Sequence, residues 1–220
     1  LGIEIPAEQV PIVQREIVRL GRMYGKPVII ATQMLQSMEK NPRATRAEIS
    51  DAATTVFEHA DAFMLSNETS VGAYPVEAVQ TLTRVASAVE EELRKNHRHL
   101  LIPQKKMELP ITNATCLEAA RLAETVQADA IVIYTKSGYT AREIAKYRPE
   151  TRLIVVTPSE YTHRTLALVW GINETILIKT KDDHEKILTL LKKIKKIHTG
   201  QEIVFCHTAH ARSILKTVRI

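Results

Sequence analysis

Cysteine is scarce in this chain. The 220 residues include only Cys116 and Cys206, which lie far apart in the sequence and form no CxxC pair. Cys116 falls on an apolar helical pattern that continues through Ala119, Ala120 and Ala123. The default interpretation is therefore a reduced thiol packed in a core, in a protein of a reducing compartment.

Long apolar runs and targeting segments are also missing. No stretch approaches the roughly 20 apolar residues of a membrane-spanning helix, and none has the basic and apolar regions of a signal peptide. We therefore expect a cytoplasmic protein with no membrane partner. The sequence starts without methionine and in the middle of a motif, so we interpret it as a fragment or a domain of a longer protein.

The charge balance is basic, with a formal net charge of +5 and an isoelectric point near 9.2. Such a balance is one sign of a nucleic-acid partner. Much of the excess lies in a predicted helix at 187–197, whose apolar spacing leaves four lysines outside: Lys192, Lys193, Lys195 and Lys196. Neither interleaved aromatic residues nor a nucleic-acid motif accompanies them, so we interpret them as a solvated helix face and expect no nucleic-acid partner.

The first part of the chain alternates helices and strands. Apolar periodicity, with glycine and proline as punctuation, predicts helices at 6–24, 45–58 and 75–95 and strands at 28–31 and 62–65. Thr45 and Glu48 form a capping-box pattern at the start of the second helix. The stretch 96–110 has two prolines and no clear period, and we interpret it as a linker between domains.

A second α/β series follows the linker. Its predicted helices lie at 112–126, 140–147, 160–168 and 187–197, and its strands at 130–134, 152–157, 175–178, 202–206 and 214–220. Asn113 is the candidate cap of the first of these helices. Strands that alternate with helices predict a mostly parallel sheet covered on both faces.

Small polar side chains follow both strands of the first series. Thr32 and Gln33 come after the strand at 28–31, and a second polar group comes after the strand at 62–65: Ser66, Asn67, Glu68 and Thr69. In α/β folds the ligand binds at the carboxyl ends of the strands, so we expect these side chains to surround one ligand. The alternative is that Thr and Ser only cap the helices that follow; two adjacent ends of the same kind favour a site.

Six segments carry a resemblance to a known family. In chain order they are LGIEIPAEQVPIVQ, KPVIIATQMLQSM, NPRATRAEISDAA, DAFMLSNETSVGAYPVEAV, TKSGYTAREIAKYRP and VVTPS. Their order and spacing resemble the pyruvate kinase family, a family of glycolytic phosphotransferases. The resemblance implies an α/β fold in which 1–97 form the last βα units of a TIM barrel. Residues 98–220 would then form the separate C-terminal α/β domain with its mostly parallel sheet.

The resemblance implies roles for the residues after the two strands. The family's reaction transfers a phosphoryl group from phosphoenolpyruvate to ADP. By this resemblance Thr32 and Gln33 bind the substrate, and Thr32, Ser66 and Glu68 are catalytic, with Thr32 delivering a proton to the enolate. The alternative for Glu68 is a first-turn position that stabilises the helix dipole. Asn67 stands where the family has Gly, and because Asn tolerates a left-handed backbone better than most residues, we expect the turn to be kept.

The loop TKSGYT at 135–140 runs from a strand into a helix, which places backbone N–H groups, hydroxyls and one ammonium together. That combination favours a phosphate. The family resemblance implies an allosteric effector phosphate held by Thr135, Lys136, Ser137, Gly138 and Thr140. The alternative is a plain capped turn. The family's second effector loop is Gly-rich, whereas 207–220 contain no Gly, which favours a monophosphate or no effector over a bisphosphate.

The family's remaining ligands are not in this sequence. The intact family enzyme uses Mg²⁺ and K⁺, but the family's metal-binding carboxylates, its phosphate-binding Lys and its lid domain belong to earlier sequence. Phosphoryl transfer depends on cation positioning, so we expect this chain to bind no metal by itself and to be inactive alone. The family also implies a homotetramer. The alternative function is a non-catalytic, phosphate-sensing or assembly module derived from a pyruvate kinase.

Overall fold

The computed structural model describes residues 4–95, 109–179, 183–209 and 212–220. The chain divides into two compact units, Leu1–Arg98 and His99–Ile220. Most of the predicted linker, residues 96–108, lies outside the described residues. Each unit has its own strands and its own hydrophobic core.

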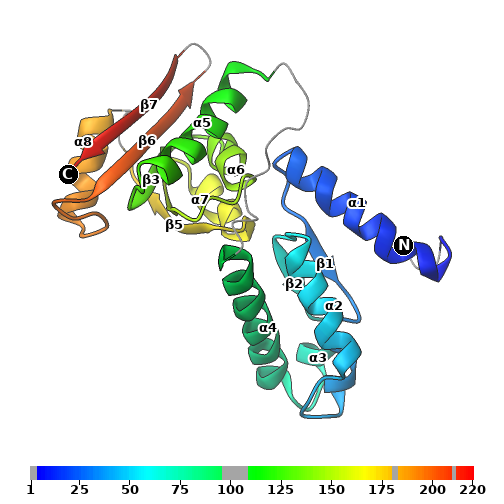
Figure 1. Cartoon of the computed structure of the whole chain (residues 1–220). Helices are drawn as coiled ribbons and strands as arrows, with labels where there is room; N and C mark the ends of the chain where they lie inside the picture. The colour runs from blue at the N-terminus through cyan, green and yellow to red at the C-terminus, as the bar shows by residue number, and fades with distance from the viewer. Residues whose placement is uncertain (1–3, 96–108, 180–182, 210–211) are drawn as a thin grey trace. The chain divides into compact units, whose positions relative to one another are not determined.

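The first unit contains the predicted helices and both predicted strands (Figure 1). In chain order its elements are η1 (Ala7–Gln9), α1 (Val10–Met23), β1 (Ile29–Ala31), η2 (Gln36–Glu39), α2 (Arg46–Phe57), β2 (Ala62–Met64), α3 (Asn67–Ser70) and α4 (Pro75–Lys95). The expected first helix opens as the 3₁₀ turn η1 before it becomes α1. The short helices η2 and α3 were not expected, because three or four residues are too few to show a helical period.

The two strands of this unit pair in parallel, with Ile30 opposite Phe63. These two side chains pack on a core that η2, α2 and α4 supply with Met38, Ala52 and Leu82. The parallel register brings the carboxyl ends of β1 and β2 to the same edge. The residues that follow the strands therefore start from neighbouring positions.

The second unit is built on a five-stranded sheet. Its elements are α5 (Ile111–Thr125), β3 (Ala130–Tyr134), α6 (Tyr139–Ala145), β4 (Arg152–Thr157), α7 (Glu160–Thr165), η3 (Leu166–Leu168), β5 (Ile172–Leu177), α8 (His184–Lys193), β6 (Glu202–Ala209) and β7 (Arg212–Arg219). The strand order is β5-β4-β3-β6-β7, and only β7 runs antiparallel to its neighbour. The mostly parallel sheet expected from the sequence is confirmed.

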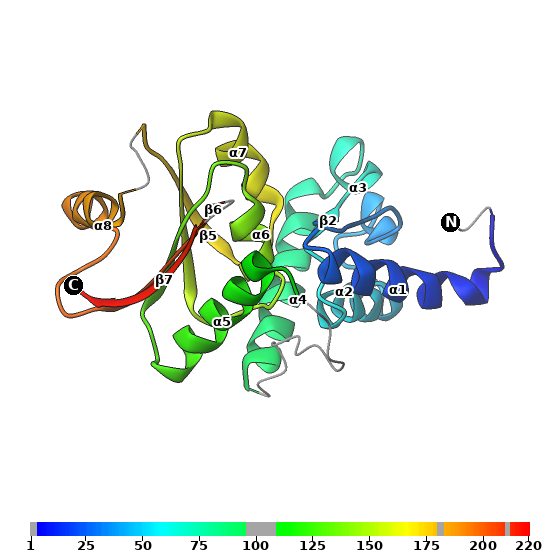
Figure 2. The ribbon, with the colours of Figure 1, turned by 90° about the horizontal axis from the view of Figure 1, so that it is seen from above.

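Helices cover both faces of this sheet, with α8 opposite α5 and α6 (Figure 2). On one face α5 and α6 pack on Ile131, Ile133 and Val155. On the other face α8 packs on Val132 and Phe205. Alternate side chains of one strand thus enter two cores, which explains why these strands read as unbroken apolar runs. Both cysteines lie in the first of these cores as fully buried free thiols.

Several boundaries in the second unit differ from expectation, and three of them are instructive. The helix α5 begins at Ile111, so Asn113 is not its cap; its amide instead donates to the Glu143 carboxylate at 2.7 Å. The strand β5 begins at residue 172, three residues early. The basic helix α8 spans His184–Lys193, so it begins three residues earlier and ends four residues earlier than the predicted range 187–197. Lys195, two residues after its end, has a left-handed backbone with φ +58°. Across the described residues, no helix is long and apolar enough to cross a membrane.

Candidate functional site

The loop after β1 holds an unusual backbone. Thr32 and Gln33 are exposed, and both are left-handed, with φ of +71° and +57°. Two successive non-glycine residues in this region are uncommon, above all when one is β-branched. Strained backbone of this kind gathers at functional sites. The sequence pointed to both residues but gave no sign of the strain.

Glu68 joins the two strand ends. Its side chain is only 2% exposed, and one carboxylate oxygen accepts the backbone N–H of Leu35 at 3.1 Å. The other oxygen accepts the backbone N–H of Ser66 at 2.8 Å. The loop after β1 is thereby fastened to the start of the loop after β2. Glu68 also stands in the first turn of α3, as the alternative interpretation required.

A second carboxylate, Glu48, fastens the far end of the first loop. It accepts the backbone N–H and the hydroxyl of Ser37, at 2.7 and 2.5 Å, and the N–H of Thr45 at 2.8 Å. Burial by itself would raise the pKa of the Glu48 carboxyl, but the hydrogen bonds from Ser37 and Thr45 outweigh it and lower that pKa. The predicted capping box of α2 is confirmed. The sequence did not predict that Glu48 also accepts hydrogen bonds from Ser37, because the two residues lie 11 positions apart and no local pattern indicates the contact.

Asn67 does not need the special backbone that was expected of it. It is the first residue of α3, and its φ is not among the positive values. The left-handed argument for this position is therefore wrong: a side chain fits here without strain. The glycine that this turn does require is Gly72, where an added Cβ would lie 2.6 Å from the carbonyl oxygen of Glu68.

The donor set at these strand ends does not fit a divalent metal by itself. It offers hydroxyls, the amides of Gln33 and Asn67, and the Glu68 carboxylate, both of whose oxygens already accept backbone N–H groups. Mg²⁺ prefers several oxygen ligands in octahedral geometry, usually with one or two carboxylates free to bind it. No cluster of three metal-ligating side chains occurs among the described residues.

The 135–140 loop forms a tight turn after β3. The Thr135 hydroxyl is buried and accepts the backbone N–H of Gly138 at 3.0 Å. Gly138 has a φ of +79° and directly precedes α6. The Thr140 hydroxyl lies 2.5 Å from that of Thr208, at the end of β6. The predicted residues are thus brought together, with Lys136 and Ser137 exposed on the turn.

Two further strand ends frame this loop. The Thr162 hydroxyl donates to the carbonyl of Lys136 at 2.6 Å, and Ser159 caps α7. Thr157 ends β4, and Thr208 lies near the end of β6. These residues were missed as neighbours of the loop. The break from apolar to polar residues at VVTPS is the signal that could have found the group at β4.

The connection between β6 and β7 is short. Ala209 pairs with Arg212, so only residues 210 and 211, which lie outside the described residues, join the two strands. The stretch 207–220 contains no Gly, so the sequence offers no glycine-rich loop here.

Two protein-family models match this chain, one in each unit. The model of the pyruvate kinase barrel domain matches residues 1–79, and that of the pyruvate kinase alpha/beta domain matches residues 113–217. The chain belongs to the pyruvate kinase family. The family's barrel and α/β domains therefore correspond to the first and second units.

Individual pyruvate kinases are also similar to this chain. The pyruvate kinase of Bacillus licheniformis is 46% identical over 203 residues, which cover 91% of this chain and 34% of the relative. That of Staphylococcus haemolyticus is 49% identical over 186 residues, or 83% of this chain and 31% of the relative. A crystal structure of a pyruvate kinase from Cryptosporidium parvum matches with a TM-score of 0.84 at 32% identity, covering all of this chain and 45% of that one. The chain thus spans about a third of the length of these curated relatives.

Proposed function

We propose that this chain supplies the carboxyl-terminal part of a pyruvate kinase, which transfers a phosphoryl group from phosphoenolpyruvate to ADP. The observation that carries the proposal is the Glu68 bridge. It joins Leu35, in the loop that also carries Thr32 and Gln33, to Ser66 at the adjacent strand end of a barrel-family unit. Strand ends of this kind are where such barrels bind their ligands.

Each residue has a proposed task. The exposed Thr32 hydroxyl and Gln33 amide bind the carboxylate of the substrate, and Thr32 passes a proton to the enolate that remains after phosphoryl transfer. Ser66 lines the same pocket. Each Glu68 oxygen accepts one backbone N–H and keeps a lone pair that can orient a water, which lets Glu68 both hold the loops and serve a proton relay.

The Mg²⁺ and K⁺ of the family enzyme would take their ligands from outside these residues. Cations neutralise the charge of the transferred phosphoryl group, and the strand ends described above do not hold them alone. The 220-residue chain is therefore expected to be inactive in isolation. The homotetramer and the cytoplasmic location implied by the family remain proposals of the same kind.

The 135–140 loop is proposed to bind one phosphate of a regulatory ligand. Three strand ends meet there, with two paired threonine hydroxyls and the exposed Lys136. The absence of Gly from 207–220 favours a monophosphate, or no effector, over a bisphosphate. A non-catalytic, phosphate-sensing module is the second candidate function. The described residues contain every residue proposed to bind the phosphate in the 135–140 loop, whereas they contain no cluster of three metal-ligating side chains.

A chimera separates these functions. The 220 residues replace the matching third of the Bacillus licheniformis pyruvate kinase, and pyruvate formation is followed through lactate dehydrogenase. We expect the chimera to consume phosphoenolpyruvate and ADP, and the isolated chain to show nothing above a contamination control. A folded chimera without turnover would reject the catalytic proposal in favour of the module. Turnover by the isolated chain would reject the argument from incomplete ligands.

A further inference from the structure

The loop between β1 and η2 changes character after its second residue. Thr32 and Gln33 are exposed and left-handed, whereas the next two side chains, Met34 and Leu35, are only 4% and 0% exposed. Met38 in η2 is fully buried in the same core. The strained pair is therefore held between the strand β1 and a segment whose side chains are fixed by burial.

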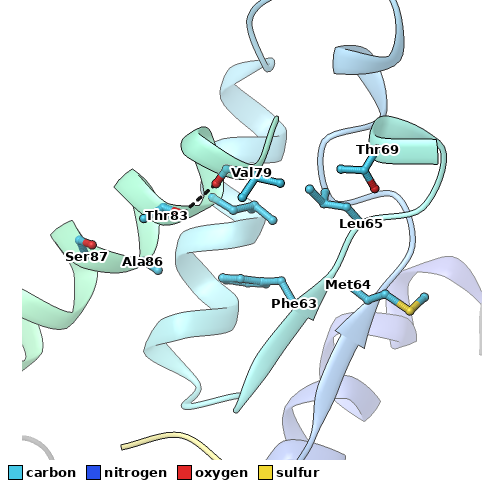
Figure 3. A pocket seen from close by; sticks show the side chains of 9 residues that line it. Phe63, Met64, Leu65, Thr69, Val79, Thr83, Ala86 and Ser87 are labelled. Atoms are coloured by element: carbon cyan, nitrogen blue, oxygen red, sulfur yellow. Dashed lines mark hydrogen bonds between the residues drawn. The ribbon is translucent and has the colours of Figure 1, made fainter. Parts of the chain in front are cut away.

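The core below this segment also receives side chains from the neighbouring strand end. Phe63 and Leu65 pack on the cluster that contains Met34 and Leu35. Figure 3 shows Phe63 and Leu65 directed toward α4, and Met64 directed to the opposite side. The buried half of the first loop thus rests on the same core as the residues that lead into the second loop.

Two carboxylates add directional contacts to this packing, which is itself non-directional. Glu68 accepts the N–H of Leu35, and Glu48 accepts both the N–H and the hydroxyl of Ser37, at 2.7 and 2.5 Å. Glu48 is half-buried on α2, where the N–H and the hydroxyl of Thr45 each donate to it at 2.8 Å. One side chain therefore ties the first turn of α2 to η2.

The strain at Thr32 and Gln33 explains why such an anchor matters. Strained backbone persists only where the surrounding structure over-determines it, so the residues that follow must be kept from shifting. We propose that Glu48 is a positioning residue for the reaction: by holding Ser37, it keeps Thr32 and Gln33 in the left-handed arrangement in which they bind the substrate. This inference rests on the proposed function, since it takes the tasks of Thr32 and Gln33 from it.

The alternative is that Glu48 serves only the capping box of α2. The box needs a carboxylate oxygen for the N–H of Thr45, and Oε2 of Glu48 provides it. The other oxygen, Oε1, accepts the N–H of Ser37, which lies outside the box. A cap alone would affect α2, whereas a positioning residue would also affect Leu35 and Thr32, in the loop before Ser37.

The first test is hydrogen exchange in the chimera with the Bacillus licheniformis enzyme. Glu48→Gln should raise exchange at Ser37 and also at Leu35 by at least about tenfold, as the loss of one or two hydrogen bonds allows. Asp51→Asn removes an exposed carboxylate from the same helix and should leave both amides unchanged. A rise confined to Ser37 would overturn the proposal, because the anchor would then be local.

The second test measures kcat for pyruvate formation. Glu48→Gln should lower kcat at least about tenfold, because a misplacement of about 1 Å can cost 10²-fold. Val89→Ala removes buried atoms from the cluster with Val56 and Leu93, and should lower the urea midpoint without lowering kcat. In a Thr32→Val background, Glu48→Gln should change kcat by less than about twofold, because a residue that acts through the Thr32 hydroxyl then has nothing to position.

Three results decide between the interpretations. An active chimera in which Glu48→Gln keeps the parent kcat would overturn the proposal. Equal falls in kcat in the parent and in the Thr32→Val background would also overturn it, because Glu48 would then not act through Thr32. A folded chimera without turnover would refute the catalytic proposal, and exchange at Leu35 would then decide alone whether Glu48 holds the loop.

Discussion

The carboxylate of Glu68 accepts the backbone N–H of Leu35 at 3.1 Å, across 33 residues of sequence. Its second oxygen accepts the N–H of Ser66. One buried side chain therefore fixes the spacing between the loops that follow β1 and β2. The left-handed Thr32–Gln33 segment ends two residues before Leu35, which this carboxylate holds.

Glu68→Gln is expected to loosen both loops. A glutamine has one acceptor oxygen, so one of the two N–H groups would face an amide NH₂ and lose its partner. Leaving a buried donor unsatisfied costs about 1–3 kcal/mol, which should appear in the free energy of unfolding. Hydrogen exchange at Leu35 and Ser66 should rise together. Glu77→Gln, at an exposed position in the first turn of α4, should change the free energy by a few tenths of a kcal/mol. Unchanged exchange at both amides in the Glu68 variant would refute the bridge.

Glu48 predicts a pH dependence. Because its pKa is lowered in the folded state, its carboxylate stabilises the fold above the ordinary glutamate pKa of about 4.3 and loses this effect as the pH falls through the lower folded value. Glu48→Gln should therefore cost about 1–3 kcal/mol near neutral pH. The difference from the parent should shrink below about pH 4. Urea unfolding at a series of pH values measures it, and a difference that is constant with pH would contradict the assignment.

The sequence predicted the parts of the site that depend on local pattern. Thr32 and Ser66 stand where apolar runs stop on polar residues, and the capping box of α2 follows from the three-residue spacing of Thr45 and Glu48. The Glu68–Leu35 and Glu48–Ser37 bonds could not be predicted, because they join residues 33 and 11 positions apart whose proximity exists only after folding. Asn113 is not the cap because Pro110 occupies the N-cap position and α5 begins at Ile111. The apolar spacing of this helix fits a start at either residue, so it cannot choose between the two caps.

Two glycines test the geometry of the 135–140 loop. Gly138 and Gly171 share a φ of +79°, but an added Cβ would lie 3.1 Å from a Leu166 methyl carbon and 3.3 Å from that of Thr162 at Gly138, and near nothing at Gly171. Gly171→Ala should cost about 1–2 kcal/mol for the left-handed backbone alone. Gly138→Ala should cost more, since crowding adds to the strain. Urea unfolding of both variants measures the difference, and equal losses would show that the turn is looser than described.

Lys136 tests whether that loop binds phosphate. A ligand that binds the folded state raises the melting temperature with concentration, and we expect this from one or more of a panel of sugar phosphates, nucleotides and inorganic phosphate. Lys136→Glu should abolish the rise and leave the unliganded melting temperature nearly unchanged, because the side chain is exposed. Lys193→Glu, at an exposed position on α8, should retain it. If no member of the panel shifts the parent, the loop is a capped turn and the regulatory proposal fails.

The most direct test of the catalytic account is the hydroxyl of Thr32 in the active chimera with the Bacillus licheniformis enzyme. Thr32→Val keeps the branched shape and removes the hydroxyl, whereas Thr32→Ser keeps the hydroxyl. Because proton transfer by a positioned group contributes roughly 10²–10⁴-fold, kcat for pyruvate formation should fall by at least about 100-fold in the valine variant and stay within about tenfold of the parent in the serine variant. A valine variant that turns over as fast as the parent would contradict the assignment of Thr32 and, with it, the account of the strand-end site.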